Sequence, residues 1–174
     1  MAVAPAALLV AQGSAFDPAS VVVTGTFADG STRARSADEY TVTGYDTATV
    51  GTRTATVSAD ASLTATDAAA VEATLAVEVL RAWAATQVYN TGEAAIHDGT
   101  RWVASWWTKN QKPGDVYGPW QQQITASDGT AVWTASRIFV AGDVVVSGDA
   151  RYTAKWRTRG QTPGDPNGPW KKIG

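Results

Sequence analysis

The feature that most constrains this chain is an internal duplication with a constant offset of fifty residues. Residues 83–124 align with residues 133–174 without a gap, and fourteen of the 42 aligned positions are identical. Unrelated segments of this composition would match at only a few positions, so the repeat is real. A unit of this length is near the lower limit for folding without disulfides or a metal. We therefore expect two small modules of the same design.

The repeat is clearest near the end of each copy. Pro113–Trp120 reads PGDVYGPW, and Pro163–Trp170 reads PGDPNGPW. We interpret the Pro-Gly-Asp part as turn chemistry, since proline fixes φ, glycine permits positive φ and aspartate accepts backbone hydrogen bonds. The two central residues differ, with Val116-Tyr117 in the first copy and Pro166-Asn167 in the second.

The amino-acid composition excludes several classes of protein. Hydrophobic residues make up 44% and charged residues 17% of the chain, which is typical of a folded soluble protein. Cysteine is absent, which excludes disulfides and cysteine-ligated zinc. No apolar run reaches the roughly 18 residues of a membrane span.

Charge is unevenly distributed along the chain. Residues 1–82 carry four basic against nine acidic side chains, and residues 133–174 carry seven against three. This asymmetry indicates separate domains. For the basic end, a solvated face is favoured over binding to nucleic acid or to an anionic wall polymer.

The region before the repeats has the pattern of a small β-sandwich, with short alternating strands separated by turns. Val21, Val23 and Phe27 share one face, and Asp29-Gly30 supplies a turn. In residues 72–80, alternate side chains from Ala73 to Val79 are apolar and point the same way.

Two stretches of this region are less regular. The Ala-rich residues 60–71 fit either a helical turn or a loop. The apolar start fits a first strand at Leu8–Val10 better than a cleaved signal segment, because a basic segment before it is missing.

This region resembles the bacterial immunoglobulin-like domains of secreted and virion proteins. The resemblance lies in FDPASVVVTGTFADGSTR, YTVTG, the strand Gly51–Val57 and the closing LAVEVL. It implies an immunoglobulin-like β-sandwich over residues 1–80 that acts as a spacer or adhesion module.

Each repeat is expected to be a small three-stranded β module stapled by aromatic side chains. In a strand, Trp102 and Trp106 lie on one face and Trp107 lies on the other. A module of this size cannot bury aromatics on both faces of so thin a sheet. At least one ring must be exposed, and large exposed aromatics mark a binding surface.

The pattern as a whole resembles carbohydrate-binding module family 5/12. It has aromatics at the positions of Trp83 and Tyr89, then Ala-x-Trp-Trp-Thr, and finally Pro-Gly-Asp and Gly-Pro-Trp, and it fits Trp83–Trp120 and again Trp133–Trp170. Members of this family are the chitin- and cellulose-binding modules of bacterial chitinases and endoglucanases. The resemblance implies binding of insoluble polysaccharide through exposed rings. Indoles can stack on the apolar faces of β-1,4-linked sugars, which requires no catalytic group.

The family pattern implies particular binding residues. Trp106 and Trp107 are the first candidates, and Trp156 is the counterpart in the second copy. Arg157 replaces the second tryptophan there. Its guanidinium plane can stack or donate to a hydroxyl, but the replacement leaves open whether the second copy binds equally well.

Further candidates lie in the return loop and at its end. Tyr117 is expected to be exposed and to contact ligand in one copy only, since Asn167 takes its place in the other. Trp120 and Trp170 are candidates for binding, with a core role as the alternative. Core roles are expected for Trp83, Trp133, Tyr89, Phe139, Trp102 and Tyr152.

Catalytic motifs are missing from the sequence. His97 is next to a predicted turn and becomes Ser147 in the repeat, which fits a solvated loop histidine. A glycosidase needs two carboxylates across a cleft. The recurring acids are Glu93 with Asp143 and Asp115 with Asp165, in modules too small to form one. We expect no enzyme activity, cofactor or metal, and the balanced charge of the first copy argues against nucleic-acid binding.

These features together predict an all-β protein. The expected domains are an immunoglobulin-like β-sandwich at 1–80, glycan-binding module 1 at 81–124, a linker at 125–132 and glycan-binding module 2 at 133–174. The predicted function is non-catalytic polysaccharide binding for adhesion, to a chitin-like or other β-linked glycan, at an extracellular or virion surface. Residues 1–80 would dock to a virion or cell-surface protein.

Two biological settings fit this prediction. A chain that starts at Met1 with neither a signal segment nor a catalytic domain favours a phage decoration or fibre protein. The alternative is an accessory binding region of a secreted chitinase or other glycoside hydrolase. The sequence leaves open which polysaccharide is bound and what the oligomeric state is.

Overall fold

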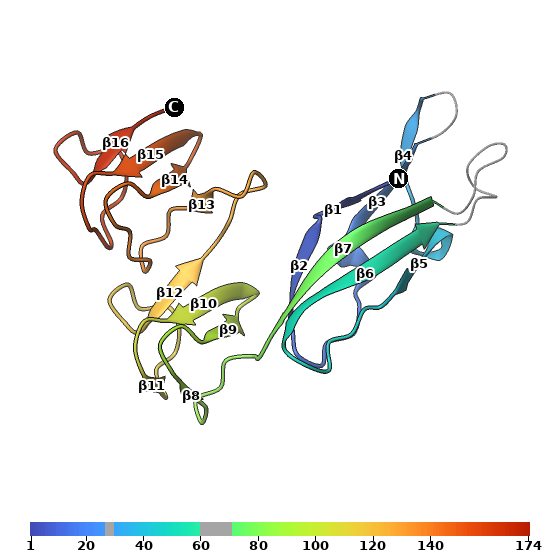
Figure 1. Ribbon diagram of the computed structural model, residues 1–174, viewed down its shortest axis with the longest axis horizontal. Coiled ribbons are helices and arrows are strands. Elements are labelled where there is room, and N and C mark those ends of the chain that lie inside the picture. The colour runs from blue at the N-terminus through green and yellow to red at the C-terminus, as the bar shows by residue number, and fades with distance from the viewer. Residues whose placement is uncertain (27–29, 60–70) are drawn as a thin grey trace. The chain divides into compact units, whose positions relative to one another are not determined.

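The protein is all-β in the computed structural model, which describes residues 1–26, 30–59 and 71–174 (Figure 1). The chain divides into two compact units, Met1–Arg81 and Ala82–Gly174. Phe27 and Asp29 lie outside the described residues, as does the stretch 60–70 for which a helical turn or loop was the expectation.

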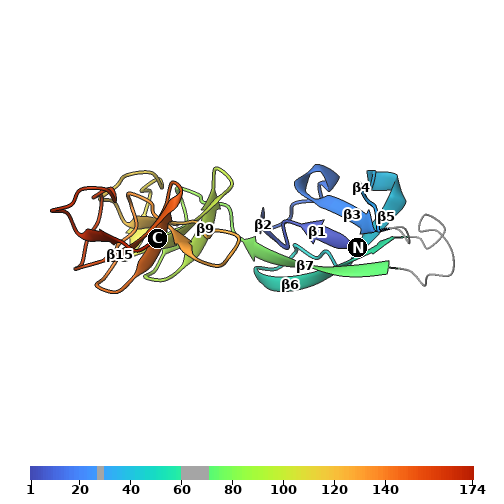
Figure 2. The same cartoon turned by 90° about the horizontal axis from the view of Figure 1, so that it is seen from above.

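Unit 1 is a β-sandwich of two sheets, and its two layers are seen in Figure 2. The first sheet has the strand order β1-β3-β4, and the second has the order β2-β7-β6-β5. Strands β2 and β7 run parallel, and the other neighbours run antiparallel. The elements are β1 (Ala2–Ala4), β2 (Ala7–Ala11), the 3₁₀ turn η1 (Pro18–Ser20), β3 (Val22–Thr26), β4 (Thr32–Ala34), η2 (Ala37–Glu39), β5 (Tyr40–Thr43), β6 (Gly51–Ala59) and β7 (Val71–Leu80).

The sandwich core follows from the period-2 alternation of the sequence. Leu75, Val77 and Val79 of β7 are fully buried, and they belong to the same core cluster as Val21 and Val23 of the opposite sheet. The predicted inward-facing sets are therefore confirmed for these five residues, whereas Ala73 is half-buried and Phe27 lies outside the described residues.

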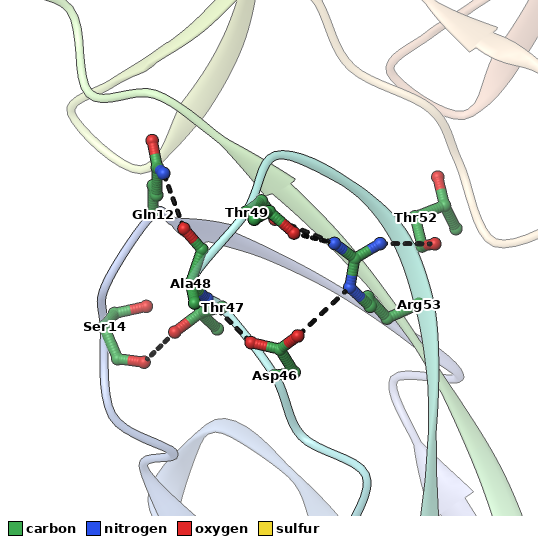
Figure 3. Close-up of polar contacts among 8 residues, drawn as sticks. All are labelled: Gln12, Ser14, Asp46, Thr47, Ala48, Thr49, Thr52 and Arg53. Carbon is green, nitrogen blue, oxygen red and sulfur yellow. Dashed lines mark hydrogen bonds and ion pairs between the residues drawn. The ribbon is translucent and has the colours of Figure 1, made fainter.

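Polar contacts between two loops close the end of the sandwich where β7 ends (Figure 3). The Thr47 hydroxyl donates to the Ser14 carbonyl at 2.7 Å, and the Gln12 side-chain amide donates to the Ala48 carbonyl at 2.6 Å. The backbone N–H of Gln12 also donates to the Leu80 carbonyl at 2.8 Å. The last residue of β7 is thus held where the chain leaves unit 1.

Module 1 begins unit 2 with a three-stranded antiparallel sheet in the order β12-β10-β9, together with the short pair β8 and β11. Its core consists of Tyr89, Ala95, Trp102, Ala104 and Trp120. The strands are β8 (Val88–Tyr89), β9 (Ala94–His97), β10 (Thr100–Ala104), β11 (Thr108–Lys109) and β12 (Trp120–Gln123).

Module 2 repeats this design with a four-stranded sheet in the order β13-β14-β15-β16. The added strand β13 pairs parallel with β14, where module 1 has a single bridge between Ala82 and Ile96. The core contains Phe139, Val145 and Trp170. The strands are β13 (Ala131–Val132), β14 (Val144–Ser147), β15 (Ala150–Ala154) and β16 (Trp170–Lys172).

The stretch 125–132, predicted as a linker, is instead folded into module 2. Ala131 and Val132 form β13, and Thr125 bridges back to Ala131. Arg151 of β15 pairs with Asp128. The stretch turns back on itself and adds a strand to β14, so it has no freedom to act as a flexible tether.

Direct hydrogen bonds also join the two modules. The Gln122 N–H donates to Ser136 Oγ at 2.9 Å, and Thr134 Oγ1 donates to the Gln122 carbonyl at 2.9 Å. The Ile138 N–H donates to Gln121 Oε1 at 2.7 Å. The outer edge of β12 is therefore covered by residues 134–138 of module 2, and we call this contact the module junction.

Candidate functional site

The exposed aromatic side chains of unit 2 are the candidate site. Trp106 is 43% exposed, Trp107 59%, Tyr117 70% and Trp156 47%. Trp106, Trp107 and Trp156 were expected here from the family pattern, and Tyr117 from its loop setting. The strand alternation that placed Trp106 on the same face as Trp102 is wrong, because β10 ends at Ala104 and Trp102 is buried. Large rings exposed on so small a unit are unusual, and this makes their surface the candidate for binding.

Trp106 and Trp107 lie on a short bend between β10 and β11 whose backbone is held at both ends. Before them, the Ser105 N–H donates to the Pro119 carbonyl at 2.7 Å. After them, Thr108 pairs with Tyr89 across β11 and β8. Because the backbone is already fixed, a ligand that stacks on these rings orders little additional chain.

Trp156 occupies the same bend of module 2. The Lys155 N–H donates to the Pro169 carbonyl at 2.6 Å, and Thr158 bridges to Phe139. Arg157 is exposed where module 1 has Trp107, and Lys155 Nζ lies 4.8 Å from the centroid of the Trp156 ring. Module 2 therefore has one exposed ring, Trp156, between two consecutive cationic neighbours in the sequence, Lys155 and Arg157.

Trp120 and Trp170 do not belong to this surface, so their prediction as binding residues is wrong. Their exposed fractions are 1% and 3%. Each indole Nε1–H donates to a backbone carbonyl at 2.7 Å, from Gln111 for Trp120 and from Gln161 for Trp170. Each ring also packs edge-to-face against the aromatic core residue of its module. These rings close the small cores and cannot stack on a ligand.

The return loop carries Tyr117 outward. Asp115 Oδ1 accepts from the Tyr117 N–H at 2.9 Å, and Asp165 Oδ1 accepts from the Asn167 N–H at the same distance. These local turns agree with the interpretation of Pro-Gly-Asp as turn chemistry. They leave the side chain at position 117 free to differ from that at 167.

The other recurring acids also have local structural contacts. Glu93 Oε2 accepts from the Asn90 N–H at 2.6 Å, and Asp143 Oδ2 accepts from the Val140 N–H at 2.9 Å. His97 is not a solvated loop residue as expected, because it lies in β9 with 16% of its side chain exposed and packs against the Trp83 ring.

Arg159 of module 2 is a site residue that the sequence interpretation missed. Its guanidinium carbon lies 6.0 Å from the centroid of the Trp106 ring of module 1. Its counterpart in module 1 is Lys109, so the alignment suggests only a conservative exchange. No signal in the sequence singles out Arg159, because 28 of the 42 aligned positions differ between the copies.

Comparisons with known proteins bear on both units. Residues 9–79 match the family model of the bacterial Ig-like domain (group 3). This match agrees with the two-sheet sandwich of unit 1 and confirms the immunoglobulin-like prediction for that region. A stretch of 40 residues, 23% of this chain, is 55% identical to Endoglucanase A of Evansella cellulosilytica. The chain spans 8% of the length of that relative.

No helix among the residues that the structure describes is long and apolar enough to cross a membrane.

Proposed function

We propose that this protein binds polysaccharide without catalysis, using the exposed rings of modules 1 and 2. One observation carries the proposal. Trp106 and Trp156 are identical between the copies and are exposed in both. The other tryptophans that the copies share are buried or packed against the module cores. A large apolar side chain that is retained without a packing role points to a ligand.

The chemistry of these rings fits a β-linked glycan. Axial C–H groups give each sugar ring an apolar face, and an indole that covers this face removes apolar area from water. The hydroxyl groups stay at the rim of the contact, where nearby cations can donate to them. A chitin-like or another β-1,4-linked chain presents such faces along its length.

Two settings for this binding remain proposals. The 40-residue similarity to a protein named as an endoglucanase supports an accessory binding region of a glycoside hydrolase. An adhesion protein on a virion or cell surface, docked through its immunoglobulin-like unit, is the other setting. Both settings imply an extracellular location, and an oligomeric chain would favour the virion.

Retention of the full chain on insoluble chitin, cellulose and bacterial cell wall tests the proposal. We expect retention on at least one of these polymers, and we expect the combined variant Trp106→Ala with Trp156→Ala to lose most of it. Val140→Ala is the matched control, because Val140 is also an exposed apolar residue of unit 2, at 51%, and lies outside the two bends. Failure of the parent chain to bind any of the three polymers would overturn the proposal.

A further inference from the structure

The inference concerns a cluster of three side chains from both modules, Trp106, Tyr117 and Arg159, which we call the junction patch. Arg159 approaches the Trp106 ring at 6.0 Å, near the limit of a cation–π contact. Tyr117 lies over the backbone of the next residue, Gly160, where an added Cβ would come within 2.9 Å of the tyrosine hydroxyl. Two adjacent residues of module 2, Arg159 and Gly160, thus each lie near an exposed ring of module 1.

Arg159 is held firmly in this position. Its Nε donates to the Ser136 carbonyl at 2.8 Å, and its Nη2 donates to the Gly118 carbonyl at 2.7 Å. Partial burial lowers the pKa of the Arg159 guanidinium, and the nearby Asp115 carboxylate acts in the opposite direction. A charged group that is fixed and partly desolvated donates stronger hydrogen bonds than a mobile one in bulk water.

The guanidinium also keeps donors for a ligand. Its hydrogen bonds to protein acceptors in the described ranges use Nε and Nη2, and none of them uses Nη1. An oxygen acceptor of a sugar stacked on a neighbouring ring would find these donors at the rim of the stack. Lys109, the counterpart of Arg159 in module 1, is exposed on β11 and has no described contact of this kind.

We propose that Arg159 of module 2 forms part of the glycan-binding surface of module 1 and donates from Nη1 to a hydroxyl or acetamido oxygen of the bound sugar. This inference rests on the proposed function. Its consequence is that the tandem pair, not the single module, is the complete binding unit. Module 2 contributes a specificity-determining residue to its neighbour in addition to its own exposed ring.

The test uses the full chain carrying Trp156→Ala, so that the measured binding comes from the module 1 surface. Affinities for the β-1,4-linked hexamers of N-acetylglucosamine and of glucose are measured by titration calorimetry. Arg159→Met should weaken binding about tenfold, as expected for loss of one hydrogen bond from a charged donor. Lys109→Met is the matched control and should change affinity less than about twofold. A loss with only the acetylated hexamer would identify the acetamido oxygen as the acceptor.

A second variant separates contact with sugar from support of the junction. Thr134→Val with Ser136→Ala removes two side-chain hydrogen bonds of the module junction and keeps the three side chains of the junction patch and the Ser136 carbonyl to which Arg159 donates. The inference is overturned if this variant weakens binding as much as Arg159→Met does, or if Arg159→Met behaves like Lys109→Met. Absence of binding by the unsubstituted chain would instead overturn the proposed function, and the inference with it.

Discussion

Module 2 has Lys171 and Lys172 where module 1 has Gln121 and Gln122, and it has Gly160 where module 1 has Asn110. Gln121, Gln122 and Gly160 lie at the contact between the modules. Lys171, Lys172 and Asn110 are the equivalent residues of the other copy. Apart from the exposed Trp106 and Trp156, many of the positions that the copies share form the cores and turns, such as Ala104 and Ala154. The comparison separates two kinds of requirement. Shared core and turn residues serve the fold of each module, and the three differences named above lie at the module junction or at the positions equivalent to it.

The turn glycines illustrate the shared set. Gly92 and Gly142 have φ values of +87° and +93°, which only glycine adopts readily. In both copies, this glycine N–H donates to the carbonyl of the alanine that ends the central strand, at 2.8 Å in module 1 and 2.9 Å in module 2. A larger residue would strain the turn, so both copies keep glycine.

The largest expected effect on stability comes from Trp120 and Trp170, the buried tryptophans at the ends of the two return loops. Trp120→Ala and Trp170→Ala should each cost about 3–5 kcal/mol, because each removes a buried ring from a very small core. The two losses should agree within about 1 kcal/mol when measured by chemical denaturation. Trp106→Ala, by contrast, should change the free energy of unfolding by less than about 0.5 kcal/mol. A large destabilisation by Trp106→Ala would place that ring in the core and remove it from the binding surface.

The difference in ligand binding that we propose between the modules should become smaller when module 2 receives a tryptophan at the position equivalent to Trp107. Arg157→Trp should strengthen retention of a Trp106→Ala chain on polysaccharide by about threefold to tenfold, since a second indole adds stacking area. Arg157→Leu serves as the control for added apolar surface without a flat ring. Equal gains from both variants would contradict the stacking argument.

Exchange of the residues at positions 110 and 160 addresses the junction. Gly160→Asn puts a Cβ 2.9 Å from the Tyr117 hydroxyl, at a φ of +74° that asparagine tolerates. Tyr117 must then move, and we expect a loss of up to about 1 kcal/mol in chemical denaturation. Asn110→Gly should stay within about 0.5 kcal/mol, because its φ of 59° suits glycine and its position faces no partner module. Similar effects of the two variants would show that position 160 has no special contact.

The smallest expected difference is a dependence on pH. Arg151 pairs with Asp128 in module 2, and the hydrogen bonds of its counterpart Arg101 in module 1 include one to Gln123. Hydrogen bonds from Thr130, with a lesser contribution from Arg151, lower the pKa of Asp128 from its usual 3.8. A lowered pKa in the folded state stabilises at pH values above 3.8, and the effect is lost as the pH falls through the folded value. A carboxyl titration by NMR should show this shift, and Thr130→Val should reduce it.

The sandwich was predicted well because it follows from local alternation, in which the buried Leu75, Val77 and Val79 are separated by the more exposed Ala76 and Glu78. Exposed rings were expected because a thin sheet cannot bury aromatics on both faces. The bend that carries Trp106 and Trp107 was not predicted, since alternation continued the strand through both residues. The positions of Trp120 and Arg159 were beyond such reasoning. A tryptophan after Gly-Pro can be exposed for binding or buried in the core, and the sequence fits both. The tertiary contact with Tyr89 shows that Trp120 is buried. Arg159 acquires its role from carbonyls of the other module, which no local pattern reveals.

Lys171 and Lys172 of β16 affect whether a further module could dock on module 2 in the way that module 2 docks on module 1. Contact through the edge of β12 is head-to-tail, and a contact of this kind can in principle propagate into a filament. It requires an acceptor at position 121, where Gln121 Oε1 receives the Ile138 N–H. At the equivalent place Lys171 presents an ammonium group, which cannot accept a hydrogen bond, and lysine on an edge strand opposes further pairing. At its second occurrence, the surface that joins the pair therefore lacks one of the three hydrogen-bonding groups of the junction and carries lysines that oppose a further contact.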